Sequence, residues 1–122
     1  MLKEILYIGA GGFIGSVLRY LISLLMKPVG NGFPWGTLTV NLIGCLLIGV
    51  IGGLISKNGN ISQNLGLFLT VGLCGGFTTF STFSKEALFL LQNGCYLSFI
   101  GYIATSVILG ILAVALGLWI TK

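Results

Sequence analysis

The sequence predicts an all-α integral membrane protein with four transmembrane helices per subunit. Of its 122 residues, 56% are hydrophobic and only 7% are charged, a composition outside the soluble globular class. The apolar residues form four long runs separated by short polar turns. A bilayer core of about 30 Å requires roughly 20 apolar residues per helix, and each run reaches that length. No segment is long enough for a soluble domain, so residues 1–122 are expected to form a single four-span membrane domain.

Turn-forming residues and tryptophans delimit the spans. We expect the spans at residues 5–26, 35–56, 62–91 and 96–120. Turns with lysine, proline, glycine, asparagine or glutamine separate them at residues 27–34, 57–60 and 92–94. Trp35 opens the second span and Trp119 lies near the end of the fourth, where amphipathic rings meet the membrane interface. The first run has no small-residue cleavage site, so we do not expect it to be a removable signal peptide.

The third span carries a polar interruption, the segment 72–84. These thirteen residues include three glycines, five hydroxyl side chains and three phenylalanines. Polar groups at membrane depth must be buried in protein or line a hydrated path, so a lipid-facing helix does not use this mixture. The adjacent Gly75 and Gly76 weaken the helix, and a mid-membrane break is expected near residues 75–80. Carbonyls released by the break, with Gly75 and Thr78 as candidates, could hold a small hard cation; the alternative is a simple glycine kink.

After the expected break, aromatic and polar residues return at helical spacing. Phe80 and Phe83 are three residues apart and share a face. Thr79, Thr82 and Glu86 form a polar stripe beside them. An aromatic ring is positive at its edge and negative on its face, so ring edges could favour an anion and ring faces a cation. The alternative is that both rings are ordinary packing residues.

The second and fourth spans supply polar side chains that could continue this stripe. Asn41 is the one strongly polar residue in the second span, and Thr37 lies one turn before it. An amide in hydrocarbon needs a partner or a hydrated pathway. Tyr102 and Ser106 are four residues apart and share a face of the fourth span. Together these donors suit a small anion that must shed water without being trapped by a fixed charge.

The charges give no preferred orientation in the membrane. The side of the two termini is expected to carry Lys3, Lys57 and Lys122, and the other side Arg19, Lys27 and Lys85. Because this division is three against three, the positive-inside rule favours neither orientation, and we expect a dual-topology, antiparallel homodimer. The alternative is that so few charges balance by chance. Arg19, the one cation well inside a span, either snorkels to the interface or attracts anions into a vestibule.

The sequence contains no residue pattern that supports catalysis or nucleotide binding. The chain has no histidine and no aspartate, and its only acids are Glu4 and Glu86. The three cysteines lie apart, with no CxxC pair, so core packing is expected of them. The glycine-rich stretch 9–15 is similar to a dinucleotide-binding fingerprint, but it lies inside a hydrophobic span with no preceding strand. We therefore expect neither an enzyme nor a partner among the nucleic acids.

Three stretches together resemble the Fluc (CrcB-type) family of fluoride channels. They are GGFIGSVLR at 11–19, WGTLTVNLIG at 35–44 and GGFTTFSTFS at 75–84. The resemblance implies an antiparallel dual-topology homodimer with two parallel pores in a bacterial cytoplasmic membrane. Fluoride would leave the cell passively, which would protect the cell against fluoride toxicity.

The resemblance also implies roles for particular residues. Phe80 and Phe83 would present ring edges to fluoride near Asn41. The polar path would include Thr79, Ser81, Thr82, Ser84, Glu86, Tyr102 and Ser106, and Arg19 would lie near the vestibule. Backbone carbonyls of both subunits would hold a structural sodium ion at the dimer centre, through Gly75 and Thr78. Gly110 departs from the family pattern, in which a hydroxyl is expected.

Two other functions remain open from the residues alone. A small multidrug or cation antiporter also has four spans and dual topology, but its proton coupling needs a buried carboxylate, and only Glu86 could serve. A non-transporting membrane assembly subunit would use the glycine-rich helices for packing alone.

Overall fold

The computed structural model describes residues 1–27 and 32–122, and these form an all-helical protein. Its elements are α1 (Leu2–Leu25), α2 (Trp35–Lys57), α3 (Gln63–Leu67), the π-helix η1 (Phe68–Cys74), α4 (Gly75–Phe77), α5 (Ser81–Gln92) and α6 (Tyr96–Ile120). Among the described residues, four helical stretches are long and apolar enough to cross a membrane: Leu2–Leu25, Trp35–Lys57, Gln63–Gln92 and Tyr96–Ile120. The prediction of four spans is confirmed by these lengths and compositions.

The residues at the ends of the helices have charges or backbone conformations suited to those positions. α1 begins at Leu2, earlier than expected, and Glu4 in its first turn pairs with the amino group of Met1 at 2.6 Å. α2 begins at Trp35, directly after Pro34. Gly94 precedes α6 with a φ of +75°, a conformation that costs glycine little. Of the turn predicted at 27–34, residues 28–31 lie outside the described part of the chain.

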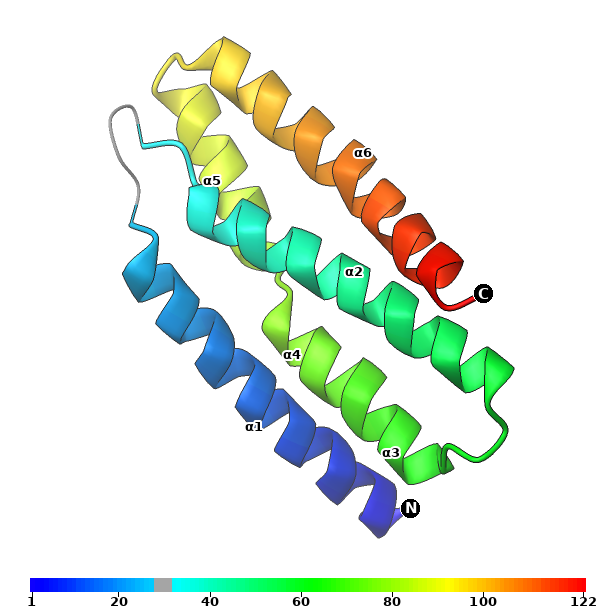
Figure 1. The fold of residues 1–122 in the computed structure, drawn as a ribbon. Coiled ribbons are helices and arrows are strands. Elements are labelled where there is room, and N and C mark those ends of the chain that lie inside the picture. Colours follow the sequence, from blue (N-terminus) through cyan, green and yellow to red (C-terminus); the bar gives the residue numbers. More distant parts are fainter. Residues whose placement is uncertain (28–31) are drawn as a thin grey trace.

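Two helix pairs form the frame of the molecule (Figure 1). α2 packs along α6, and α1 packs along η1 and α4. The third span joins the two pairs, because α3 and α4 contact α1 whereas α5 contacts α6. Both termini lie toward the same end of the molecule, as an even number of spans requires (Figure 1).

Glycines let the backbones of each pair touch. A Cβ atom added to Gly49 of α2 would collide with the carbonyl of Val114 on α6. A Cβ atom added to Gly15 of α1 would lie 2.7 Å from the backbone nitrogen of Phe77 and would collide with the carbonyl of Leu73. Glycines therefore lie at the helix contacts themselves, where they permit tight packing.

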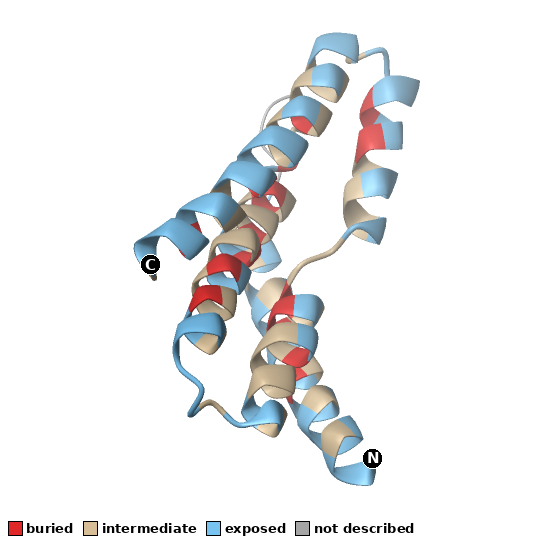
Figure 2. Cartoon of the chain, turned by 90° about the vertical axis from the view of Figure 1, so that its right-hand side faces the viewer, coloured by how far each residue is buried: buried red, intermediate tan, exposed pale blue. Residues whose placement is uncertain are grey.

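A small apolar core joins α2, α5 and α6. It is centred on the buried residues Leu38, Ala87, Leu90 and Tyr102. Most other large apolar side chains are exposed, such as Phe13 at 72% and Leu97 at 86%. Figure 2 shows this pattern as short buried patches on helices that are otherwise largely exposed. Lipid is the expected neighbour of these outer faces.

The third span changes its backbone geometry twice. Phe68–Cys74 is π-helical, a rare geometry that often occurs at functional sites. α4 ends at Phe77, residues 78–80 are not helical, and α5 begins at Ser81. Thr78 is extended, with φ −86° and ψ 161°. The interruption therefore follows the glycine pair, and Gly75 and Gly76 are themselves helical.

Candidate functional site: a cavity at the interruption of the third span

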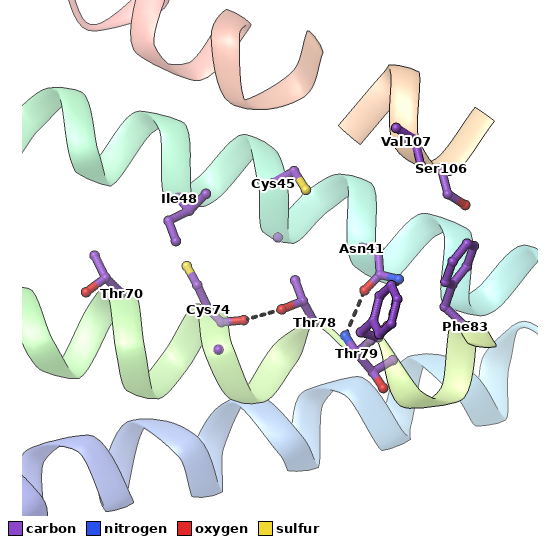
Figure 3. Close-up of a pocket in the computed structure, with 13 residues that line it drawn as sticks. Asn41, Cys45, Ile48, Thr70, Cys74, Thr78, Thr79, Phe83, Ser106 and Val107 are labelled. Atoms are coloured by element: carbon purple, nitrogen blue, oxygen red, sulfur yellow. Dashed lines mark hydrogen bonds between the residues drawn. The ribbon is translucent and has the colours of Figure 1, made fainter. Parts of the chain in front are cut away.

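A cavity of about 380 Å³ lies where the third span loses its helical geometry (Figure 3). Its lining comes from α2, α6 and the third span: Asn41, Gly44, Cys45, Ile48, Thr70, Cys74, Gly75, Thr78, Thr79, Phe80, Phe83, Ser106 and Val107. None of these side chains carries a formal charge at neutral pH. Seven of the predicted site residues meet here: Asn41, Gly75, Thr78, Thr79, Phe80, Phe83 and Ser106.

Asn41 on α2 binds the non-helical backbone of the third span directly. Its Oδ1 accepts a hydrogen bond from the Thr79 amide at 2.8 Å, and its Nδ2 donates to the Thr79 carbonyl at 3.0 Å. Both backbone groups of Thr79 are thus satisfied by one side chain (Figure 3 shows the shorter bond). This is the partner that an amide inside an apolar span requires.

The Gly75 carbonyl loses its usual donor through the same contact. In a continuous helix the amide of Thr79 would donate to the carbonyl of Gly75, four residues earlier. Here that amide donates to Asn41 instead. The Cys74 carbonyl, one residue earlier, keeps its helical donor, the Thr78 amide at 3.0 Å, and also accepts from the Thr78 hydroxyl at 2.9 Å. The two carbonyls expected to hold a cation therefore belong to a segment whose helical bonding has been replaced.

Phe80 and Phe83 lie together beside Asn41. Their ring centroids are 5.7 Å apart with an angle of 44° between the planes. Phe80 is 78% exposed. Phe83 is half-buried and packs against Tyr102 with centroids 4.9 Å apart. The shared face predicted from their spacing is confirmed, and the two rings have different surroundings.

The hydroxyls of the third span divide between the cavity and the outside. The hydroxyl of Thr79 lies 3.4 Å from that of Ser81 and accepts from the amide of Thr82 at 3.2 Å. Ser81 and Ser84 are exposed and line neither this cavity nor the second one described below. The predicted position of Ser81 and Ser84 beside a path therefore does not arise within a single chain.

Ser106 presents the clearest unsatisfied donor. Its Oγ is buried and has no hydrogen-bond partner among the described residues, although the residue lines the cavity. A buried hydroxyl without a partner costs free energy, so an unsatisfied one in a cavity wall suggests that a ligand or water completes it.

Glu86 forms a polar cluster with the second and fourth spans. Thr37 Oγ1 donates to one carboxylate oxygen at 3.1 Å, and the Tyr102 hydroxyl donates to the other at 2.9 Å. Tyr102 is completely buried. The cluster adjoins Phe83, because the rings of Phe83 and Tyr102 are in contact.

A second cavity, of about 230 Å³, contains the predicted vestibule residue Arg19. Its lining comprises Arg19, Tyr20, Ser23, Gly36, Thr37, Val40, Thr79 and Thr82. The Nε atom of Arg19 donates to the Gly76 carbonyl at 3.1 Å. Thr79 lines both cavities, so it separates them.

Several cavity residues were not predicted from the sequence. Gly44, Cys45 and Ile48 follow Asn41 at three, four and seven residues, the spacing of one helix face, and this periodicity could have identified them. A Cβ atom on Gly44 would collide with the Thr78 methyl group, so this glycine lets the interrupted segment approach α2. The expected packing role of Cys45 and Cys74 is thus incomplete, because both free cysteines also line the cavity.

No group of three or more histidine, cysteine or acidic side chains is placed to bind a metal within the described residues. Any cation held here would therefore need backbone carbonyls or hydroxyls as ligands.

Comparison with known proteins agrees with the sequence resemblance. A protein from Phocaeicola vulgatus named fluoride-specific ion channel FluC is 53% identical over 99% of this chain and 100% of its own length. Proteins of the same name from Flavobacterium psychrophilum and Rhizobium meliloti are 48% and 47% identical, over 99% and 96% of this chain and 98% and 94% of their own lengths. Residues 6–118 match the family described as CrcB-like protein, Camphor Resistance (CrcB). This chain is therefore a multi-pass membrane protein of the CrcB family.

Proposed function

We propose that this protein is a fluoride channel that lets fluoride leave the cell passively and so protects against fluoride toxicity. The relatives are named as fluoride-specific ion channels, and they match nearly the whole chain. The observation that carries the proposal is the cavity at the interruption. It combines two phenylalanine rings, an amide and an unsatisfied hydroxyl, with no charged group in its wall.

This combination suits a small, strongly hydrated anion. Many weak donors acting together can replace its water, and the absence of a fixed cation avoids trapping the ion. Ring edges of Phe80 and Phe83 contribute positive electrostatic potential. We place the path through the cavity with Arg19, past Thr79, into the cavity with the rings. Its wall would include Thr37, Asn41, Thr79, Ser81, Thr82, Ser84, Glu86, Tyr102 and Ser106.

The assembly that we propose is an antiparallel, dual-topology homodimer with two pores. A single chain leaves the Phe80 ring largely exposed and Ser81 and Ser84 outside both cavities. A second copy crossing at the interruption would cover them. In this arrangement the break of the third helix lies at mid-membrane, where unsatisfied backbone is tolerated only inside protein or beside a watery path. We place the dimer in the bacterial cytoplasmic membrane, since the relatives named above come from bacteria.

The same segment suits a structural sodium ion at the dimer centre. Hard cations prefer oxygen ligands, including backbone carbonyls. The Gly75 carbonyl lacks its helical donor because the Thr79 amide binds Asn41. Gly75 is exposed, and a Cβ atom there would meet no atom closer than the Thr70 carbonyl at 3.8 Å. The carbonyls of Gly75 and Thr78 from two copies would supply the ligands.

The alternatives are less well supported. A proton-coupled antiporter would use Glu86, but both oxygens of this carboxylate already accept hydrogen bonds, from Thr37 and Tyr102. A purely structural subunit has no use for a buried, unsatisfied hydroxyl in the wall of a cavity. Family membership also favours the channel.

Fluoride efflux from liposomes tests the function directly. Purified protein is reconstituted alone, and a fluoride electrode follows release after the membrane potential is clamped with potassium and valinomycin. We expect rapid fluoride release and negligible chloride release. Retention of fluoride equal to that of protein-free vesicles would refute the proposal.

A further inference from the structure

Arg19 makes a contact that attraction of anions does not require. Its Nε atom donates to the Gly76 carbonyl, on a segment 57 residues away in the chain. In a continuous helix the amide of Phe80 would donate to that carbonyl, but the helix ends at Phe77. The arginine therefore replaces a backbone donor at the end of α4. No hydrogen bond joins its terminal Nη groups to any residue that the structure describes.

The packing of α1 against α4 brings Arg19 to this place. Gly15 lies one helical turn before Arg19 and shares its face. A Cβ atom on Gly15 would lie 3.1 Å from the carbonyl carbon of Gly76, and one on Gly76 would lie 2.7 Å from the Gly12 carbonyl. With the backbones in direct contact, the side chain one turn later reaches the last carbonyls of α4.

Two side chains thus brace the interruption from opposite sides. Arg19 on α1 holds the Gly76 carbonyl before it, and Asn41 on α2 holds both backbone groups of Thr79 after it. Between these braces lies the extended residue Thr78. Phe80 directly follows Thr79 in the chain. An orientation imposed at both ends leaves little freedom for the peptides between them.

We propose that Arg19 is a positioning residue whose Nε–H group fixes the Gly76 peptide and thereby the geometry of the interruption, independently of the arginine charge. The inference rests on the fluoride-channel function proposed above. It separates two properties of one side chain: the Nε donor that binds the backbone, and the positive charge of a residue that lines the second cavity.

Three substitutions separate donor from charge. Arg19→Gln removes the charge but keeps an amide nitrogen at the same number of bonds from the backbone as Nε. Arg19→Lys keeps the charge but puts a methylene at that point. Arg19→Met is similar in length to glutamine and has neither. Size-exclusion chromatography in detergent identifies variants that assemble like the wild type, and fluoride and chloride efflux from liposomes are then compared at low and high ionic strength.

We expect Arg19→Gln to conduct fluoride roughly tenfold faster than Arg19→Lys and Arg19→Met, the factor that corresponds to about 1.4 kcal/mol in a barrier. The advantage of glutamine should persist at high ionic strength, because it does not depend on charge. A lysine variant equal to or faster than the glutamine variant would overturn the proposal, as would equal rates in all variants. If Arg19→Met fails to assemble, the comparison of glutamine with lysine still decides. A wild-type protein that releases no fluoride would instead refute the channel function itself.

Discussion

The side-chain amide of Asn41 pairs with Thr79 as one strand residue pairs with another, donating to its carbonyl and accepting from its amide. The two residues lie 38 positions apart in the chain. One side chain therefore satisfies a stretch of backbone that has left the helix, at the wall of the cavity that contains the phenylalanine rings.

Replacing Asn41 by aspartate should damage both contacts and conduction. The aspartate can still accept from the Thr79 amide, but its second oxygen would face the Thr79 carbonyl, and its negative charge would oppose an anion. We expect fluoride efflux to fall roughly tenfold or more, because a lost charged or buried hydrogen bond costs on the order of 1–3 kcal/mol. The matched control is Asn64→Asp on α3, outside both cavities. Equal efflux in the two variants would contradict the role of Asn41.

Phe80→Ile and Phe83→Ile should separate conduction from stability. Both remove a ring edge from the cavity, so each should slow fluoride efflux by about tenfold, the effect of an aromatic contact of about 1.4 kcal/mol. Only Phe83→Ile should lower the midpoint of thermal unfolding in detergent, since Phe83 packs against Tyr102 whereas Phe80 is mostly exposed. Phe89→Ile, on the outer part of α5, serves as the control. Unchanged efflux in both cavity variants would remove the rings from the mechanism.

Glu86→Gln should leave a passive fluoride pathway. Glutamine keeps one oxygen that can accept from Thr37 or Tyr102, but its amide group faces the other hydroxyl. We expect efflux reduced by no more than roughly tenfold, in keeping with one weakened hydrogen bond. An imposed pH gradient should drive no uphill movement of organic cations in either protein, with Glu4→Gln as the control. Proton-driven uptake that disappears in Glu86→Gln would favour the antiporter.

Gly49→Ala should destabilise the fold because the new methyl group would collide with the Val114 carbonyl. Overpacking of this kind costs about 1–3 kcal/mol. Gly9→Ala is the control, since nothing lies within 4 Å of a Cβ atom at that position. Thermal unfolding in detergent should show a lower midpoint for Gly49→Ala and an unchanged or slightly higher one for Gly9→Ala, because alanine is the better helix former. A normal midpoint for Gly49→Ala would show that α2 and α6 can separate without cost.

Hydrophobic run lengths predicted the four spans well, because bilayer thickness fixes how many apolar residues a helix needs. The composition of residues 72–84 also indicated where the third span departs from α-helical geometry, although the non-helical residues come after the glycines. Local pattern could not supply the partners of this segment. The hydrogen bonds from Arg19 and Asn41 depend on how three helices pack against one another. Gly44 and Cys45 carry no strongly polar side chain that would mark them in the sequence as cavity residues.

The contacts among polar side chains of different spans also could not be predicted from local sequence. Thr37, Glu86 and Tyr102 were each predicted beside one path, but their joining around a single carboxylate is a tertiary contact. The antiparallel dimer, the sodium ion and the roles of the path residues stay predictions, since each depends on a second copy or an ion.

The shared location of the two chain ends has a practical consequence (Figure 1). A reporter fused after Lys122 reads the compartment of both ends at once. Green fluorescent protein is bright only when it folds in the cytoplasm, and alkaline phosphatase is active only when exported. Cells in which both fusions of this polypeptide gave strong signals would contain molecules inserted in opposite senses.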